Sequence, residues 1–160
     1  MAALDTVAPL SPDLLPAALA LNNDHAAELS LLDDARFRQL VAWSWYSAVI
    51  GPADALILTF DPSSPYDSPN FRWFQSHYPR FVYVDRVVVA PRARGRGLAR
   101  RLYNAVFEKA RAENLPMVTC EINLDPPNPG SEAFHAAMGF SAVGDATPNG
   151  KAVRYFTKAL

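Results

Sequence analysis

Short runs of apolar and β-branched residues alternate along this chain with longer stretches in which apolar residues recur every three or four positions. The runs are typical of strands, and the longer stretches are typical of amphipathic helices. Hairpins flank a single strand–helix–strand unit, so the pattern predicts a mixed α/β sheet in one domain, residues 1–160, and disfavours a doubly wound parallel sheet. The predicted strands are Asp5–Leu10, Ser47–Ile50, Ala55–Asp61, Phe81–Ala90, Pro116–Asn123, Phe140–Val143 and Val153–Lys158, and the predicted helices are Ser11–Asn23, Asp33–Ala42, Gly97–Glu113 and Ser131–Met138.

One segment fits neither periodicity. Pro62–Pro79 is rich in polar, aromatic and proline residues, and it is predicted to be a long loop. Loops of this length inside compact domains are usually functional or disordered, and the aromatic content favours a function. The aromatic residues either line a binding site or cover a hydrophobic edge of the sheet, and the sequence leaves both interpretations open.

Composition narrows the class of protein. The formal net charge is -1, which disfavours nucleic acid or an anionic membrane as a partner. The single cysteine, Cys120, excludes an internal disulfide and a multi-cysteine zinc site, and it is expected to be a small buried hydrophobe. No apolar run approaches the length of a transmembrane helix, and the pattern of a signal peptide is absent. We therefore expect a cytoplasmic globular protein without a bound metal.

The segment Val87–Ala99 carries the clearest candidate chemistry. It is predicted to form the end of a strand, a loop rich in glycine and arginine, and the first turn of a helix. The first turn of a helix leaves backbone N–H groups unpaired and partly positive, and Gly95 and Gly97 allow a ligand to approach them. These features predict a phosphate or pyrophosphate site. The nucleoside-triphosphate pattern is absent, and the dinucleotide pattern fails because Arg100 stands where a third glycine is required.

Two motifs resemble those of the GNAT superfamily of N-acetyltransferases. Val89–Ala99 reads VAPRARGRGLA and is similar to the acyl-coenzyme A loop of that family, V-x-P-x-x-R-G-x-G-[IL]-[GA]. Asn128–Phe140 is similar to a second family motif, N-x-x-[AS]-x-x-[LF]-Y-x-x-x-G-F, except that His135 stands in place of the tyrosine. The resemblance implies a mixed, mostly antiparallel central sheet of about seven strands with one splayed parallel pair, flanked by about four helices.

The resemblance also implies which residues hold acetyl-coenzyme A (acetyl-CoA). Backbone amides of the glycine and arginine loop would bind the pyrophosphate, and the backbone of Val87 and Val89 would pair with the pantetheine arm. An amide near Val88 would polarise the thioester carbonyl. The arginines near the loop are either solvated surface residues or further phosphate ligands. The residues expected to bind acetyl-CoA are Val87, Val88, Val89, Arg94, Gly95, Arg96, Gly97, Leu98, Ala99, Asn128, Ser131, Phe134 and His135.

Acetyl transfer also needs an acid that protonates the leaving thiolate. By resemblance, His135 would replace the tyrosine that acts as this acid. Since its unperturbed pKa is about 6.5, it would need a proton before each turnover, and activity would fall at high pH. Its alternative role is that of a polar helix residue without a catalytic function. Glu121 and Asp85 are the candidate bases, although either can instead pair with Arg86 or Arg154, and many enzymes of the family use water chains alone.

The acceptor is expected to bind opposite the coenzyme. The predicted function is transfer of an acetyl group from acetyl-CoA to a primary amine, on a small molecule or a protein, by direct attack in a ternary complex. A non-catalytic acyl-CoA sensor of the same fold is the alternative, and the resemblance leaves a homodimer open. The candidate acceptor residues are Asn22, Asn23, Tyr66, Asp67, Asn70, Phe71, Trp73 and Tyr83, although Asn22 and Asn23 can equally end the first helix.

Overall fold

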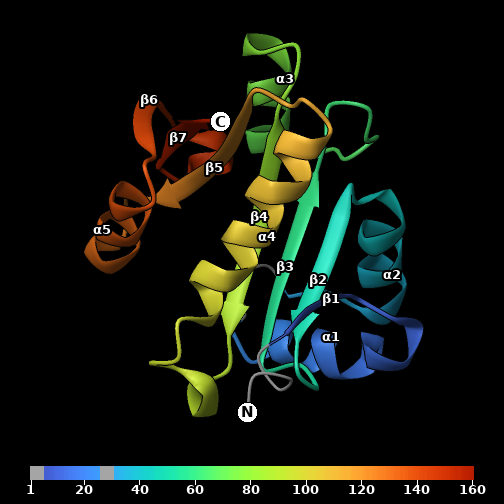
Figure 1. The fold of residues 1–160 in the computed structure, drawn as a ribbon. Helices are drawn as coiled ribbons and strands as arrows, with labels where there is room; N and C mark the ends of the chain where they lie inside the picture. Colours follow the sequence, from blue (N-terminus) through green and yellow to red (C-terminus); the bar gives the residue numbers. More distant parts are fainter. Residues whose placement is uncertain (1–5, 26–30) are drawn as a thin grey trace.

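A single seven-stranded sheet runs through the protein in the order β1-β2-β3-β4-β5-β7-β6 (Figure 1). The computed structural model describes residues 6–25 and 31–160. The mixed α/β sheet predicted from the sequence is confirmed, although Asp5, the expected start of the first strand, lies outside the described residues. The strands are β1 (Val7–Pro9), β2 (Tyr46–Ile50), β3 (Ala55–Phe60), β4 (Val82–Val89), β5 (Met117–Asn123), β6 (Ser141–Ala146) and β7 (Val153–Ala159).

The centre of the sheet contains a splayed parallel pair, as the family resemblance implied. Neighbouring strands are antiparallel everywhere except between β4 and β5. These two strands pair only through Val82 with Val118 and Tyr83 with Thr119, close to the start of each strand. Beyond this point β4 stays paired with β3 and β5 stays paired with β7, so the two strands diverge.

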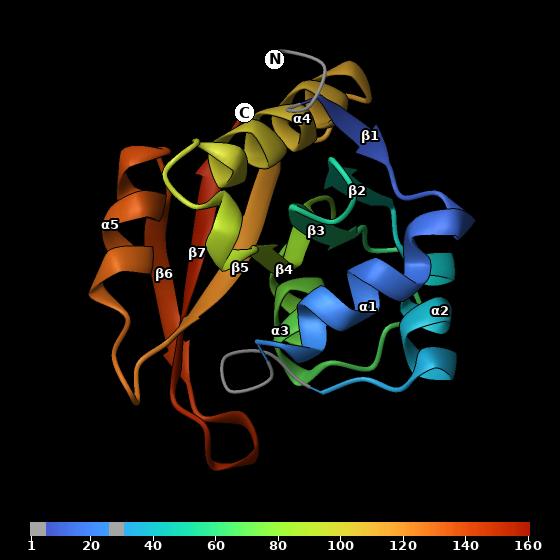
Figure 2. The ribbon, with the colours of Figure 1, turned by 90° about the horizontal axis from the view of Figure 1, so that it is seen from below.

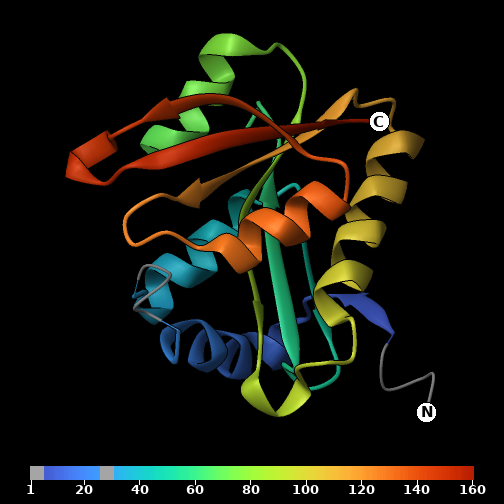
Figure 3. The same cartoon turned by 90° about the vertical axis from the view of Figure 1, so that its left-hand side faces the viewer.

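Helices cover both faces of the sheet. Figure 2 shows α4 on one face and α1, α2 and α3 on the other, and Figure 3 shows α5 beside α4. A 3₁₀ turn, Pro12–Leu14, precedes α1, because Pro12 at its first position fixes a helical φ. The helices are α1 (Leu15–Asn23), α2 (Asp34–Trp43), α3 (Pro69–His77), α4 (Leu98–Ala112) and α5 (Pro129–Ala137).

The helix α3 forms inside the segment predicted to be a loop, and that prediction is wrong for Pro69–His77. The Ser68 hydroxyl caps this helix by accepting a hydrogen bond from the Phe71 amide at 3.4 Å, and Pro69 occupies the favoured first turn. Phe71 and Phe74, three positions apart, are both fully buried. The aromatic residues of the segment therefore form a helical apolar face, which the many prolines and polar residues obscured.

Two apolar layers hold β4 in place. On one face, α4 buries Leu98, Leu102, Val106 and Ala110, whose spacing follows the helical repeat. On the other face, Phe71 and Phe74 of α3 belong to an aromatic cluster that includes Tyr83 of β4. Because β4 is packed from both sides, the point at which it leaves β5 is fixed by the core.

Candidate active site

Two cavities meet where β4 and β5 diverge. Each has a volume of about 460 Å³. One, the α3-side cavity, is lined by Tyr66, Asp67, Asn70 and Tyr83, and the other, the α5-side cavity, is lined by Val87, Tyr103, Ser131 and His135. The residues that line both cavities are Asp85, Arg86, Glu121, Asn123 and Lys151.

A β-bulge in β4 lies at the junction of the cavities. The register with β3 passes from Thr59 opposite Val84 to Leu58 opposite Arg86, so Asp85 is the extra residue of the bulge. A bulge bends its strand and changes the direction of its side chains. It brings both Asp85 and Arg86 to the junction, although neighbouring residues of a regular strand point to opposite faces.

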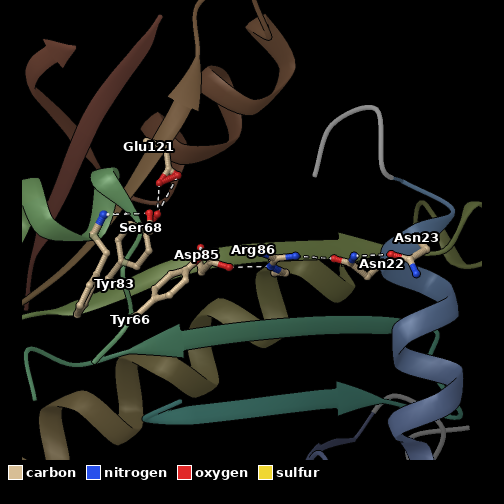
Figure 4. A network of polar contacts seen from close by, with 9 residues as sticks. Asn22, Asn23, Tyr66, Ser68, Tyr83, Asp85, Arg86 and Glu121 are labelled. Carbon is tan, nitrogen blue, oxygen red and sulfur yellow. Dashed lines mark hydrogen bonds and ion pairs between the residues drawn. The ribbon is translucent and has the colours of Figure 1, made fainter. Parts of the chain in front are cut away.

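A chain of buried hydrogen bonds fixes the charge state of this bulge (Figure 4). The Tyr66 hydroxyl donates to Oδ1 of Asp85 at 2.8 Å, and Nε of Arg86 donates to Oδ2 at 2.6 Å. Nη1 of Arg86 donates to Oδ1 of Asn22 on α1 at 2.8 Å. Burial alone would lower the pKa of Arg86, but the Asp85 carboxylate outweighs this effect and the pKa is raised. Asp85 and Arg86 therefore form a fixed, charge-neutral pair with both carboxylate oxygens occupied.

Glu121 differs from Asp85 in its surroundings. Its carboxylate accepts hydrogen bonds from the Tyr83 hydroxyl, and the two side chains face each other across the diverging strands (Figure 4). Burial raises the pKa of Glu121 to about 8; the Tyr83 hydrogen bond opposes this rise, and nearby Asp85 adds to it. The Glu121 carboxyl therefore gains and loses its proton close to neutral pH, which suits a group that transfers protons.

His135 lies on the wall of the α5-side cavity and is only 6% exposed. Its Nδ1 is 2.7 Å from the Ser131 carbonyl oxygen, and its Nε2 is 2.7 Å from the hydroxyl of Tyr103 on α4. Burial lowers the pKa of His135 below its ordinary value of 6.5, with a partly opposing effect of the Ser131 carbonyl. His135 is therefore mainly neutral at pH 7 in the free protein.

The glycine and arginine loop leads into α4 with an open N-terminus. Gly95 and Gly97 have φ of +80° and +71°, and a Cβ on either would meet nothing within 4 Å. No side chain of the described residues caps the helix at Gly97. Arg92 holds the loop to the β2–β3 turn through an ion pair with Asp54 at 2.9 Å. The backbone thus presents the first amides of α4 to open space, as an anion site requires.

The other residues expected to bind acetyl-CoA lie on β4, at the start of α4 and on α5. Val87, Val88 and Val89 are the last three residues of β4, next to the loop, and Val87 lines the α5-side cavity. Asn128 also lines this cavity and caps α5, since its Oδ1 accepts a hydrogen bond from the Ser131 amide at 3.1 Å. The remaining members of the set differ in exposure: Arg94 and Arg96 are exposed, Ala99 and Phe134 are partly buried, and Leu98 is buried.

The candidate acceptor residues fall into two groups. Tyr66, Asp67, Asn70 and Tyr83 line the α3-side cavity. The others support its surroundings: Phe71 is fully buried, and Trp73 stacks on Tyr155 with ring centroids 4.2 Å apart. Asn22 bonds Arg86, and Asn23 exchanges hydrogen bonds with the backbone of Leu32 at 2.9 and 3.0 Å.

Sequence reasoning did not single out three residues of the site. They are Tyr103, Asn123 and Lys151. Tyr103 contacts His135, which is 32 positions away in the sequence. Asn123 at the end of β5 and Lys151 just before β7 line the same cavity because these two strands are paired. Tyr103 and Phe107, four positions apart, share a helical face with Phe140 as a neighbour of both rings, so the aromatic spacing was a usable signal.

Comparison with known proteins identifies the family. The model of the Acetyltransferase (GNAT) family matches residues 21–140, and the chain therefore belongs to this family. A search of curated proteins finds no match. Among solved structures, the chain is similar to the ribosomal-protein-alanine N-acetyltransferase from Brucella melitensis (23% identity, TM-score 0.73, covering 97% of this chain and 99% of that one). It is also similar to yncA, a putative acetyltransferase from Salmonella typhimurium with its cofactor acetyl-CoA (17% identity, TM-score 0.71, covering 97% and 93%).

A third similar structure is that of the NatC complex bound to Gag peptide and CoA (17% identity, TM-score 0.71, covering 97% of this chain and 98% of that one). At these identities the structural likeness concerns the fold. Within residues 6–25 and 31–160, no helix is long and apolar enough to cross a membrane. The same described residues contain no group of three or more His, Cys, Asp or Glu side chains that could hold a metal ion.

Proposed function

We propose that the protein transfers an acetyl group from acetyl-CoA to a primary amine by direct attack in a ternary complex. The observation that carries this proposal is the meeting of two cavities at the β4–β5 splay, with Glu121 on the wall of both. A donor in one cavity and an amine in the other would approach each other at the junction. Such a geometry favours direct transfer because both reactants can be held at the same time.

The α5-side cavity and the loop beside it suit the donor. The open amides of the first turn of α4, with Gly95 and Gly97 at positive φ, fit a pyrophosphate. The backbone of Val87 and Val89 would pair with the pantetheine arm, and an amide near Val88 would polarise the thioester carbonyl. Acetyl-CoA supplies the activated acetyl thioester, and these residues bind it and orient it.

Glu121 is the stronger of the two candidate bases. Both oxygens of the Asp85 carboxylate already accept hydrogen bonds, from Tyr66 and Arg86. Glu121 accepts hydrogen bonds from the Tyr83 hydroxyl, and burial raises the pKa of its carboxyl to about 8. As the amine attacks, its proton would pass to the Glu121 carboxylate, directly or through water. Asp85 would then not accept the proton itself, and its charge would instead help to set the pKa of Glu121.

The acceptor is an amine on a small molecule or on a protein. The α3-side cavity combines the aromatic ring of Tyr66 with oxygen acceptors on Asp67 and Asn123, which can receive hydrogen bonds from an amine. Some of the similar structures act on or bind proteins, since one is a ribosomal-protein-alanine N-acetyltransferase and another is bound to Gag peptide. We therefore include peptide N-termini among the candidate acceptors.

The test is release of free thiol from acetyl-CoA in the presence of a panel of small amines and peptides with free N-termini. Thiol release that depends on the amine, with an acetylated product of the expected mass, supports the proposal. The alternative is a non-catalytic acyl-CoA sensor, which is favoured by the engagement of both ring nitrogens of His135 in internal hydrogen bonds. Binding of acetyl-CoA without thiol release on any amine of the panel would establish the sensor.

A further inference from the structure

The wall of the α5-side cavity contains a hydrogen-bonded pair from two different helices. Tyr103 lies on α4 and His135 on α5, and the tyrosine hydroxyl is 2.7 Å from Nε2 of the histidine. Their rings meet edge to face with centroids 5.3 Å apart. Both residues line the cavity, and their exposed fractions are only 1% and 6%. The pair is therefore rigid and screened from bulk water.

The partners of His135 fix where its protons are. The Ser131 carbonyl can only accept a hydrogen bond, so Nδ1 of His135 carries a proton and donates it at 2.7 Å. In the neutral ring Nε2 is then an acceptor, and the Tyr103 hydroxyl donates to it. Nδ1 lies 2.7 Å from the Ser131 carbonyl oxygen and 3.3 Å from the Ser131 hydroxyl, whereas Nε2 contacts the Tyr103 hydroxyl, so the Tyr103 oxygen is the route from Nε2 to a ligand in the cavity.

We propose that Tyr103 carries the proton of His135 to the departing thiolate sulfur, so that the proton donor in contact with the sulfur comes from α4. This proposal rests on the function proposed above. As the amine forms its bond to the carbonyl carbon, the carbon–sulfur bond breaks and the sulfur leaves with the electron pair. The phenol proton of Tyr103 passes to the sulfur while the Nε2 proton of the imidazolium passes to the phenol oxygen. Sulfur ends as a thiol, Tyr103 ends as a phenol and His135 ends neutral.

The direction of transfer is favourable. An imidazolium with a pKa below 6.5 is a stronger acid than a thiol, whose ordinary pKa is about 8.5. Tyr103 itself is a poor final donor, because burial raises the pKa of its phenol well above the ordinary value. Tyr103 therefore relays the proton, and His135 is the source of the proton. The other titratable or charged groups that line this cavity are Asp85, Arg86, Cys120, Glu121 and Lys151, of which Cys120 and Glu121 act on Tyr103.

The first test measures the ionisation of the CoA thiol bound to the protein, without any catalytic turnover. The probe is free CoA, whose bound thiol is titrated by its thiolate absorbance, with the complex of desulfo-CoA as the blank. A thiolate accepts a hydrogen bond more strongly than the neutral Nε2 of His135 does, so a Tyr103 hydroxyl in contact with the sulfur would turn to the thiolate and stabilise it. Tyr103→Phe keeps the ring contacts with Phe107, Phe134 and Phe140 and removes only the hydroxyl. We expect the ionisation constant of the bound thiol to fall at least about tenfold in this variant.

A matched control removes a hydroxyl elsewhere. Tyr46→Phe, on β2 and outside both cavities, should leave the thiol titration unchanged. If CoA binds to Tyr103→Phe with the same thiol titration as to the unmodified protein, the proposal is overturned while the proposed function stands. If CoA does not bind to the unmodified protein, the proposed function itself fails, and this proposal fails with it.

The second test uses the fact that Tyr103 and His135 act in series. Tyr103→Phe, His135→Ala and the double variant should each lose about 100-fold in kcat, because either change interrupts the same path. Two independent structural defects would instead multiply in the double variant, and that result would overturn the relay. A further readout is the pH profile of kcat/KM, calculated for the neutral amine. Between pH 6.5 and about pH 8 it should be flat in the unmodified protein and rise with pH in Tyr103→Phe, where only Glu121 still titrates.

Discussion

Replacement of Glu121 by Gln should lower activity and raise stability at the same time. The carboxyl has a pKa of about 8 in the folded protein, compared with 4.5 for an unperturbed glutamate. Because the pKa is raised on folding, the folded state binds more protons than the unfolded state between these two values. Stability therefore falls as the pH rises through this window, and the loss is complete above about pH 8. Glutamine keeps a similar shape but cannot ionise, so the variant avoids this loss.

The size of the effect follows from the shift. A change of about 3.5 pH units corresponds to about 5 kcal/mol at 1.36 kcal/mol per unit. Glu121 is partly exposed to its cavities, and solvent screening there reduces the figure. We expect Glu121→Gln to be about 2–4 kcal/mol more stable than the unmodified protein at pH 9 and nearly equal to it at pH 4.5. Urea denaturation at a series of pH values measures this difference.

The activity of the same variant should move in the opposite direction. Loss of a general base costs about 100-fold or more in kcat/KM. Under the proposed mechanism the reaction needs His135 charged and Glu121 ionised, so the unmodified protein should show a plateau between the two pKa values, with decreases below and above it. Without Glu121 only the histidine titrates, and kcat/KM for the neutral amine should fall with pH across the former plateau. Initial rates of thiol release from pH 5.5 to 9.5 measure both profiles.

The matched control is Asp67→Asn, which makes the same chemical change in the same cavity. Asp67 is exposed and paired with Arg36, so its replacement should change neither the pH profile nor stability by more than about 0.5 kcal/mol. The reasoning is wrong if Glu121→Gln keeps the plateau, or if its stability advantage does not grow with pH. The first result would remove Glu121 as the base, and the second would show that its carboxyl ionises as readily as it does in water.

Two further predictions concern the glycine and arginine loop and the buried ion pair of Asp85 and Arg86. Gly97→Ala should raise the KM for acetyl-CoA about tenfold, because its Cβ would enter the space in front of the α4 amides. The control is Gly150→Ala, since Gly150 has a similar positive φ in another turn. This variant should show the same backbone strain of about 1–2 kcal/mol but keep the KM for acetyl-CoA. Arg86→Met should destabilise the protein by about 3–5 kcal/mol in urea denaturation, since it leaves the Asp85 carboxylate buried without its cation. Arg38→Met, which breaks an exposed helical pair, should cost less than about 0.5 kcal/mol.

The fold and the conformation of the glycine and arginine loop were largely predictable because their signals are local. The strand, the glycine loop and the helix start occupy one continuous segment, Val87–Ala99, and both glycines have the positive φ that makes the loop possible. The β4–β5 splay followed from the family resemblance and was confirmed. The helix α3 was also signalled locally, by Ser68 as a cap and Pro69 in the first turn, but the polar and proline-rich composition of the segment outweighed these two residues.

The polar side of the site was less predictable because its partners are distant in sequence. Arg86 meets Asn22 across 64 positions, and Tyr83 meets Glu121 across 38. These contacts depend on how α1 docks on the sheet and on where β4 leaves β5. The bulge at Asp85 has no local signal either, since neither glycine nor proline marks it. Sequence periodicity predicts alternate faces for Asp85 and Arg86, and only the bulge brings them together.

The charge-neutral pair of Asp85 and Arg86 allows a test of which carboxylate is the base. The charge of Asp85 raises the pKa of Glu121, and the charge of Arg86 lowers it. Asp85→Asn removes the first effect and keeps the second, so the pKa of Glu121 should fall. If Glu121 is the base and Asp85 acts only through charge, Asp85→Asn should remain active, and the upper limit of the kcat/KM plateau should move from about pH 8 to a lower pH. If Asp85 is the base, the same variant loses activity at every pH and no shift is seen. Measurement of the plateau edge, and not of activity at one pH, separates the two roles because a purely structural defect lowers the rate without moving the edge.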